Sequence, residues 1–178
     1  MKVDRAEFEK AVESGRSKAE RIQIIGALLG AALGSPVVVV GGSAIEVHTS
    51  GRTSSSDIDF VTPDSSPQSR SVAIVKSWGF VPNGRVWRRP DWNVDLDLLG
   101  QDLKGSRAHL VRVETAYGPI YLLGYEDLIA KRLAELKHGH VHDPEWRRDL
   151  LKQVRLLLSE HGEPRIRFCS VESCRGAA

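Results

Sequence analysis

The chain has 178 residues, a formal net charge of +2, and 41% hydrophobic and 27% charged residues. This composition is typical of a folded globular protein and excludes a disordered chain, and the small net charge argues against non-specific coating of nucleic acid. No apolar run reaches the roughly 18 residues that span a membrane, and the charged segment 1–10 lacks an apolar signal core. We therefore expect a cytoplasmic globular protein with no membrane partner.

Local signals in the first third of the chain predict helices at the N-terminus and then two strands. Capping-box patterns at Asp4–Glu7 and Ser17–Glu20 start two helices, and Gly34 ends the second. The continuous β-branched run Val37–Val40 is typical of a buried strand. The predicted elements are helices 5–14 and 18–33, strand 37–40, a short helix 43–49, loop 49–56 and strand 57–61.

The rest of the chain predicts two hairpins, one further strand and a helical end. Pro67 suits the first position of a helix, and Asn83-Gly84 is a strong turn dipeptide. Apolar and acidic residues alternate within 92–99, which predicts a strand with Asp95 and Asp97 on one face. The predicted elements are a helix from Ser66-Pro67 to Gly79, hairpin arms 80–81 and 86–87, strand 92–99, and hairpin arms 111–115 and 120–123. Two helices follow. The apolar stripe of the first is Leu128, Ile129, Leu133 and Leu136, and that of the second is Trp146, Leu150, Val154 and Leu157.

This order of elements predicts an α/β (α+β) fold in which a short mixed sheet is packed by helices. No internal repeat and no interdomain linker divides the sequence. We expect residues 1–124 to form the core with its N-terminal helices, and residues 125–178 to form a C-terminal helical segment packed on that core.

The sequence Asp57-Ile58-Asp59 places two carboxylates on one side of a strand, roughly 6.5–7 Å apart along the chain. Such a pair repels itself, so a folded protein rarely tolerates it unless a divalent cation lies between the two groups. The acidic strand 92–99 supplies a third carboxylate, Asp97 or Asp95. Three carboxylates would complete two metal sites of the kind that hold the attacking and leaving oxygens in phosphoryl transfer.

The sequence Gly41-Gly42-Ser43 lies between a buried strand and a predicted helix. Bare backbone N–H groups at a helix start form a phosphate site, because the orphan donors and the helix dipole both favour an anion. Ser43 can cap this helix, bind phosphate or do both. Tight packing between strand and helix is the alternative explanation for the glycine pair.

The glycine turn, the Asp-x-Asp strand and an Asp on a later strand together resemble the DNA polymerase β-like nucleotidyltransferase superfamily. The resemblance extends over roughly residues 20–158. Three shorter segments look more narrowly like the bacterial branch that includes abortive-infection nucleotidyltransferase toxins. They are Gly42-Ser43-Ala44, Arg52-Thr53 and the segment from Leu123 to Leu133.

This resemblance implies a nucleotidyltransferase fold, Mg²⁺ or Mn²⁺ as cofactor and an NTP as substrate. The family pattern for the third acid is an acid followed by two apolar residues, which Asp97-Leu98-Leu99 fits better than Asp95-Leu96-Asp97. The implied site residues are Asp57, Asp59 and Asp97 as catalytic and metal-binding groups, Asp95 as the alternative metal ligand, and Gly41, Gly42, Ser43, Arg52 and Lys131 as substrate contacts.

The implied reaction transfers NMP from the NTP to an acceptor. A toxin-like protein would modify RNA, such as the 3′ end of tRNA, or a protein, and would have a cognate antitoxin as partner. A small hydroxylated antibiotic and a catalytically silent binding module are the alternatives. Arg85, Arg88 and Arg89, interleaved with Trp87 and Trp92, suit RNA contacts, or else their stems pack over the tryptophan faces.

Overall fold

The computed structural model describes residues 3–63, 68–92, 94–138 and 143–162. Within these ranges the chain forms helices, strands and two short 3-10 helices, η1 (Pro90–Trp92) and η2 (Arg107–His109). The α-helices are α1 (Arg5–Glu13), α2 (Lys18–Leu33), α3 (Gly41–His48), α4 (Gln68–Ser77), α5 (Tyr125–His138) and α6 (Pro144–His161). The strands are β1 (Val38–Val40), β2 (Ile58–Val61), β3 (Val81–Asn83), β4 (Val86–Arg89), β5 (Val94–Leu98), β6 (Val111–Thr115) and β7 (Gly118–Leu122).

The strands form one mixed sheet in the order β3-β4-β5-β2-β1-β7-β6. Strand β1 runs antiparallel to β2 and parallel to β7, and β2 runs parallel to β5. In this register Asp59 on β2 lies opposite Val40 on β1 and opposite Asp97 on β5. Because directly paired residues point to the same face of a sheet, Asp59 and Asp97 lie side by side on one face.

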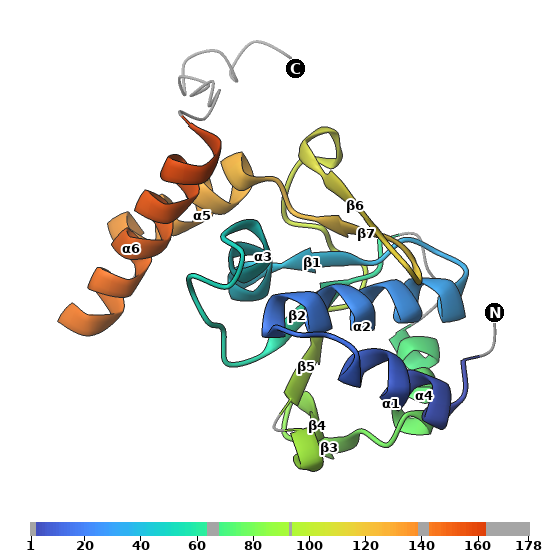
Figure 1. The fold of residues 1–178 in the computed structure, drawn as a ribbon. Helices are drawn as coiled ribbons and strands as arrows, with labels where there is room; N and C mark the ends of the chain where they lie inside the picture. The colour runs from blue at the N-terminus through green and yellow to red at the C-terminus, as the bar shows by residue number, and fades with distance from the viewer. Residues whose placement is uncertain (1–2, 64–67, 93, 139–142, 163–178) are drawn as a thin grey trace, which may run out of the picture.

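Helices α1, α2 and α4 cover the other face of the sheet (Figure 1). Phe60 points to this covered face, where a Cβ on Gly26 of α2 would lie 3.2 Å from its ring. Phe8 of α1 stacks on Trp78 with ring centroids 4.2 Å apart and meets Phe80 edge-on. These aromatic contacts join α1 to the end of α4 and form the part of the core below the sheet.

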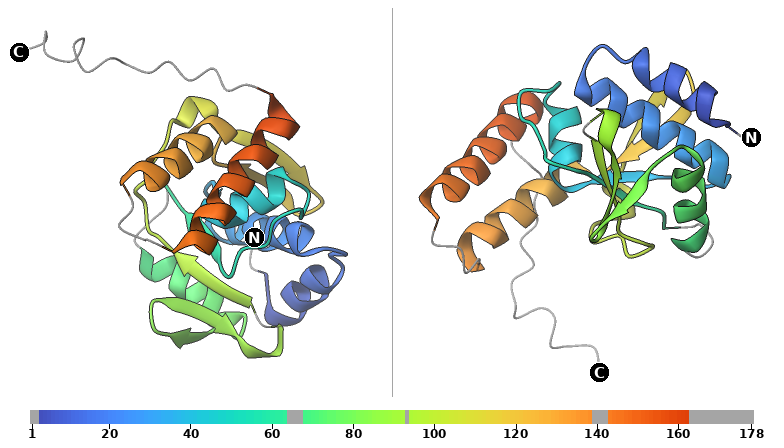
Figure 2. Two further views of the ribbon diagram at one scale, coloured as in Figure 1. Left: turned by 90° about the vertical axis from the view of Figure 1, so that its left-hand side faces the viewer. Right: turned by 90° about the horizontal axis from the view of Figure 1, so that it is seen from below.

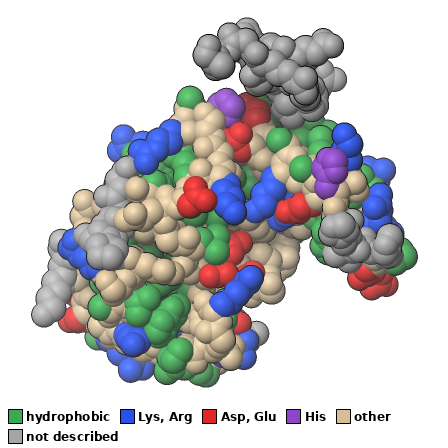
Figure 3. All heavy atoms as spheres, turned by 180° about the vertical axis from the view of Figure 1, so that it is seen from behind, with side chains coloured by type: hydrophobic (Ala, Val, Ile, Leu, Met, Phe, Trp, Pro, Cys, Tyr) green, Lys and Arg blue, Asp and Glu red, His purple; other side chains and the backbone are tan. Residues whose placement is uncertain are grey.

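Helices α5 and α6 pack on each other and on α3 at one end of the molecule, as two further views show (Figure 2). The face of the sheet that α1, α2 and α4 leave uncovered is seen from behind, and charged side chains gather in its middle (Figure 3). The predicted fold class is confirmed, since a mixed sheet is packed by helices and followed by a helical segment. Among the described residues, no helix is both long enough and apolar enough to cross a membrane.

The helix boundaries follow from the capping residues that the sequence shows. Asp4 accepts a hydrogen bond from the backbone of Glu7, and Ser17 accepts one from the backbone of Glu20. Gly34 ends α2 in the left-handed conformation, with φ of 68°. Each of these groups satisfies backbone donors or acceptors that a helix end leaves unpaired, so the first two helices match their predicted ranges closely.

Several predicted boundaries differ in the structure. Helix α3 begins at Gly41, two residues earlier than expected, because both glycines form its first turn. The residues Pro90–Trp92 form η1, so β4 reaches Arg89 and β5 begins only at Val94. The second hairpin begins its return strand at Gly118, before the expected Ile120. The predicted start of α4 at Ser66-Pro67 lies outside the described residues.

Candidate active site

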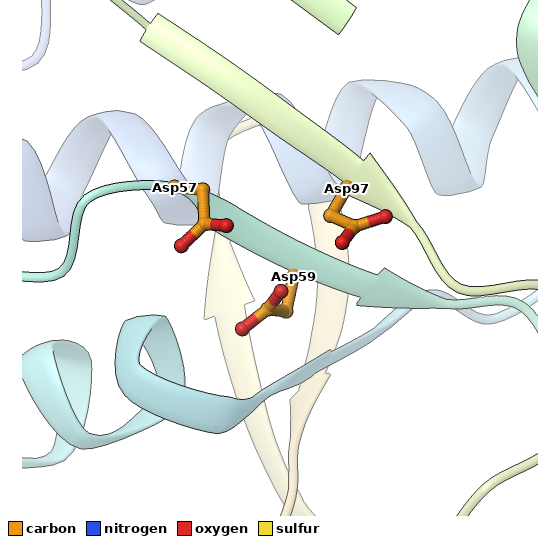
Figure 4. A group of neighbouring side chains, drawn as sticks. All are labelled: Asp57, Asp59 and Asp97. Atoms are coloured by element: carbon orange, nitrogen blue, oxygen red, sulfur yellow. The ribbon is translucent and has the colours of Figure 1, made fainter. Parts of the chain in front are cut away.

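Three aspartates meet on the uncovered face of the sheet (Figure 4). Asp57 precedes β2, Asp59 lies within it and Asp97 lies on β5. One carboxylate oxygen from each of the three lies within 4.8 Å of the others. Asp97 is only 5% exposed, whereas Asp57 and Asp59 are half-buried. We call these three residues the acid trio.

The acid trio repels itself electrostatically. Burial, and then the charges of Asp57 and Asp97, raise the pKa of Asp59 to about 6. Burial also raises the pKa of Asp97, with a smaller contribution from Asp57, while Arg85 acts in the opposite direction. Lys131 and Arg85 lower the pKa of Asp59 without cancelling the upward shift. A cation placed among these groups would remove the repulsion.

The geometry of the acid trio fits a divalent metal ion. Oδ2 of Asp97 is buried and accepts no hydrogen bond from the described residues, although Arg85 approaches it to 3.2 Å without hydrogen-bond alignment. A buried carboxylate oxygen without a hydrogen-bond donor is costly unless a cation compensates it. Closely spaced carboxylate oxygens are the ligands that Mg²⁺ and Mn²⁺ prefer, so Asp57, Asp59 and Asp97 would hold such an ion.

Gly41 is required by the position of Asp59. Its φ is 63°, and a Cβ at this residue would lie 2.2 Å from Oδ2 of Asp59. A side chain there would force the Asp59 carboxylate to move, so the backbone of the first turn of α3 lies directly against this carboxylate. Val40, the N-cap of α3, supplies no side-chain hydrogen bond to this turn. The start of α3 thus places backbone N–H groups beside the acid trio.

Ser43 joins α3 to β2. Its hydroxyl donates a hydrogen bond to the carbonyl oxygen of Val40 at 2.9 Å and accepts one from the backbone N–H of Asp59 at 3.1 Å. The side chain is completely buried. Ser43 therefore does not cap α3, because its hydroxyl donates to a carbonyl oxygen and accepts from a neighbouring strand. It joins the first turn of α3 to Asp59, while its contact with a triphosphate stays a prediction.

Two expected site residues lie away from the acid trio. Asp95 forms a two-pronged ion pair with Arg88, at 2.8 Å and 2.6 Å, and this pairing lowers its pKa. Asp95 therefore lies outside the acid trio, and its role as the alternative metal ligand stays a prediction. Arg52 pairs with Glu160 and contacts Ser159 at the end of α6, so the structure uses it to attach the loop before β2 to the C-terminal helix.

The cluster Arg85, Arg88 and Arg89 does not form an open basic patch. Arg88 holds Asp95, and Arg89 is buried and bonded to Glu9, Asp91 and the carbonyl oxygen of Trp78. The Arg89 guanidinium also lies 4.4 Å from the ring centroid of Trp92, which matches the packing alternative. Arg85 alone reaches the acid trio, with Nη2 3.8 Å from Asp57 and Nε 3.2 Å from Asp97.

A pocket of about 320 Å³ lies beside the acid trio. Four aliphatic side chains and three charged ones line it: Val40, Val61, Leu99, Leu123, Asp102, Lys104 and Lys131. Val61 follows Asp59 by two residues on the same face of β2, and Leu99 follows Asp97 by two residues just beyond the end of β5, which places the pocket directly next to the carboxylates. Lys131 thus contributes both to the pocket and to the electrostatics of Asp59.

Sequence reasoning did not identify Leu99, Asp102, Lys104 and Leu123 as site residues, because they come from separate loops and strand ends. Arg132 was also missed, although it directly follows Lys131. A Cβ on Gly42 would lie 4.0 Å from its Nη2, and hydrogen bonds to Gln153 and Glu135 fix the guanidinium there. The signal that could have identified Arg132 is its position directly after Lys131 on the same helix.

Comparison with known proteins supports this interpretation of the fold. No protein-family model and no curated protein matches the sequence. A solved structure of similar fold is that of an antigenic nucleotidyltransferase-like protein from Paracoccidioides brasiliensis. The superposition has a TM-score of 0.55 and 14% sequence identity, and covers 78% of this chain and 75% of that chain. The fold is nucleotidyltransferase-like.

At 14% identity the likeness concerns the fold alone. The predicted resemblance to nucleotidyltransferases is confirmed at that level. The structural similarity does not extend to the narrower resemblance to abortive-infection toxins, which stays a prediction.

Proposed function

We propose that the protein is a metal-dependent nucleotidyltransferase that transfers NMP from an NTP to an acceptor. The acid trio beside the N-terminus of α3 carries this proposal, because it places metal-binding carboxylates next to a phosphate-binding backbone. In the reaction, an acceptor oxygen attacks the α-phosphorus, the bond from that phosphorus to the bridging oxygen breaks, and pyrophosphate leaves.

The residues of the chain have separate tasks in this reaction. Asp57, Asp59 and Asp97 hold Mg²⁺ or Mn²⁺, which when bound supplies positive charge to the reacting phosphate. The backbone at the start of α3 and the ammonium group of Lys131 bind the triphosphate. Asp97 or Asp59 accepts the proton that the acceptor oxygen loses, while the metal ion, when bound, would supply most of the activation of that oxygen.

The nucleoside of the NTP would occupy the pocket next to the acid trio. Its volume of about 320 Å³ falls within the range of about 300–1,000 Å³ that is typical of small-molecule sites. Aliphatic side chains from Val40, Val61, Leu99 and Leu123 suit a flat base, and charged groups at the rim suit its polar edge. Leu99 is 47% exposed, and a bound base would cover it.

The acceptor is proposed only as a hydroxyl-bearing or similarly nucleophilic group. The expected RNA contacts at Arg88 and Arg89 are engaged within the fold, which removes the feature that favoured RNA. RNA, protein and small-molecule acceptors, and a cognate antitoxin, therefore stay predictions to be separated by experiment.

The test is incubation of the purified protein with Mg²⁺ and each of the four NTPs labelled at the α-phosphate. Total cell RNA, a set of aminoglycoside-type hydroxylated compounds and the protein alone serve as acceptors in parallel. We expect label to appear in one acceptor class, with release of pyrophosphate, and to disappear with EDTA and with Asp59→Asn. If no acceptor is labelled with any NTP, and the protein also binds no NTP in a metal-dependent way, the result would support the silent binding module instead.

A further inference from the structure

Glu46 on α3 is a buried carboxylate that the proposed reaction does not use. It is only 2% exposed and lies one turn beyond the glycines that start the helix. Its Oε2 accepts hydrogen bonds from the backbone N–H of Ser55 at 2.8 Å and from the Ser55 hydroxyl at 3.1 Å. The same oxygen lies 3.4 Å from Nζ of Lys18 on α2. Such a buried charge persists only where its partners compensate it.

Ser55 connects this carboxylate to the acid trio. Its hydroxyl lies 2.8 Å from the carbonyl oxygen of Asp57 and donates to it or to Glu46. Its own carbonyl oxygen accepts a hydrogen bond from Lys18. Ser55 also packs against α3, since a Cβ on Gly42 would lie 3.2 Å from the Ser55 Cβ. One loop residue thus touches the helix start and the first metal-binding aspartate.

We propose that Glu46 is a positioning residue, whose bonds to Ser55 set the place of Asp57 relative to the N-terminus of α3. This role rests on the proposed function, because it concerns the distance between a metal ligand and the bound triphosphate. Asp59 has its own connection to α3 through Ser43. Asp57 lies outside the strand, so its position depends on the loop that Glu46 and Lys18 hold from two sides.

The physical basis is the lack of regular structure between α3 and β2. Residues 49–57 belong to no helix or strand, and Ser50 has a positive φ of 50°. A metal-binding residue on such a segment keeps a fixed position only if hydrogen bonds from side chains replace the backbone hydrogen bonds that a strand would make. Removing a residue that holds a metal-binding residue in place commonly lowers metal affinity or activity about 10- to 100-fold.

The experiment compares Mn²⁺ affinity, measured by electron paramagnetic resonance, in the wild type, Glu46→Ala and Glu46→Gln. We expect Glu46→Ala to raise the Kd for Mn²⁺ at least about tenfold. Glu46→Gln keeps an acceptor for Ser55 and should stay close to the wild type. As a matched control, Trp78→Phe removes a buried hydrogen bond outside the site, from the indole N–H to the carbonyl oxygen of Val3 at 3.1 Å. It should lower the melting temperature and leave the Kd unchanged.

A folded Glu46→Ala protein with the Mn²⁺ Kd of the wild type would overturn the positioning role. If Glu46→Ala does not fold, Glu46→Asp takes its place, because it keeps the negative charge beside Lys18 but shortens the side chain and withdraws the carboxylate from both Ser55 donors. An unchanged Kd in that variant would overturn the role equally. A wild-type protein that binds neither Mn²⁺ nor NTP would overturn the proposed function itself, and the role of Glu46 with it.

Discussion

Nε of Arg85 lies 3.2 Å from Oδ2 of Asp97, across the mouth of the acid trio. The guanidinium also reaches Asp57 from the turn between β3 and β4. The arginine side chain is 78% exposed, whereas Asp97 is buried, so a surface cation faces a buried acidic group. Arg85 therefore supplies part of the positive charge that the carboxylates need, at the place where a metal ion would bind.

Replacing Arg85 with Ala should strengthen Mn²⁺ binding. In the wild type, the guanidinium of Arg85 and the ion compete for the same carboxylates. Removing the guanidinium ends this competition. Because exposed ion pairs contribute little, we expect a Kd about two- to fivefold lower. Titration calorimetry without nucleotide measures this effect, and Arg112→Ala, which removes an exposed arginine paired with Glu114, serves as control. Weaker binding in Arg85→Ala would show that the arginine supports the ion.

Replacing any member of the acid trio with Asn should abolish transfer without unfolding the protein. Losing a metal ligand commonly costs several kcal/mol of transition-state stabilisation, or about a thousandfold in rate. Asp95→Asn is the control, because Asp95 binds Arg88 and lies outside the acid trio. It should keep measurable activity. Loss of the fold in Asp57→Asn and Asp59→Asn would make these aspartates structural and would contradict the enzyme hypothesis.

The stability of the metal-free protein should depend on the ionisation of Asp59. Its pKa is raised from 3.8 to about 6 in the folded state, so the folded protein binds a proton that the unfolded chain releases. The contribution of this group to stability is present below the unfolded value, falls as the pH rises towards about 6, and stays low above it.

Asp59→Asn should accordingly raise the melting temperature above pH 6 and have little effect near pH 4. Thermal unfolding of both proteins in EDTA, from pH 4 to pH 8, gives the difference directly. Adding Mg²⁺ at pH 8 should stabilise the wild type and leave Asp59→Asn almost unchanged. A melting-temperature difference that does not vary with pH would contradict this account of the repulsion.

Leu99→Ser should weaken NTP binding while leaving the binding of inorganic tripolyphosphate unchanged. Leu99 lines the proposed nucleoside pocket, and tripolyphosphate carries no base. Removing this apolar contact should raise the Kd for the NTP by about tenfold. Leu151→Ser is the matched control, because Leu151 is 41% exposed on α6 and Leu99 is 47% exposed. Equal losses for both ligands would place the base elsewhere.

Local signals predicted most of the fold, because caps, turn dipeptides and apolar periods act over a few residues. Asp57 and Asp59 were identified as a pair for the same reason. The choice between Asp97 and Asp95 could not be made from alternation alone, since both point to one face of β5. The structure separates them through Arg88, which holds Asp95 on the neighbouring strand.

What local signals left undecided concerns contacts between distant segments. The sequence allowed Arg89 either to contact RNA or to pack over a tryptophan, and the structure shows the packing, with a partner, Glu9, that lies 80 residues away. The role of Glu46 likewise depends on the loop around Ser55, whose position beside α3 no local pattern predicts. The pocket beside the acid trio is assembled from strand ends and a helix that no single pattern joins.

The steric contact between Gly41 and Asp59 gives a simple criterion for comparing related sequences. A carboxylate in the position of Asp59 leaves no room for a side chain at residue 41. Conversely, a chain that has lost this aspartate is free of that constraint and can accumulate larger residues there, apart from the cost of the positive φ. The two positions should therefore diverge together, and a bulky residue in place of the glycine would mark a homologue that has lost the acid trio.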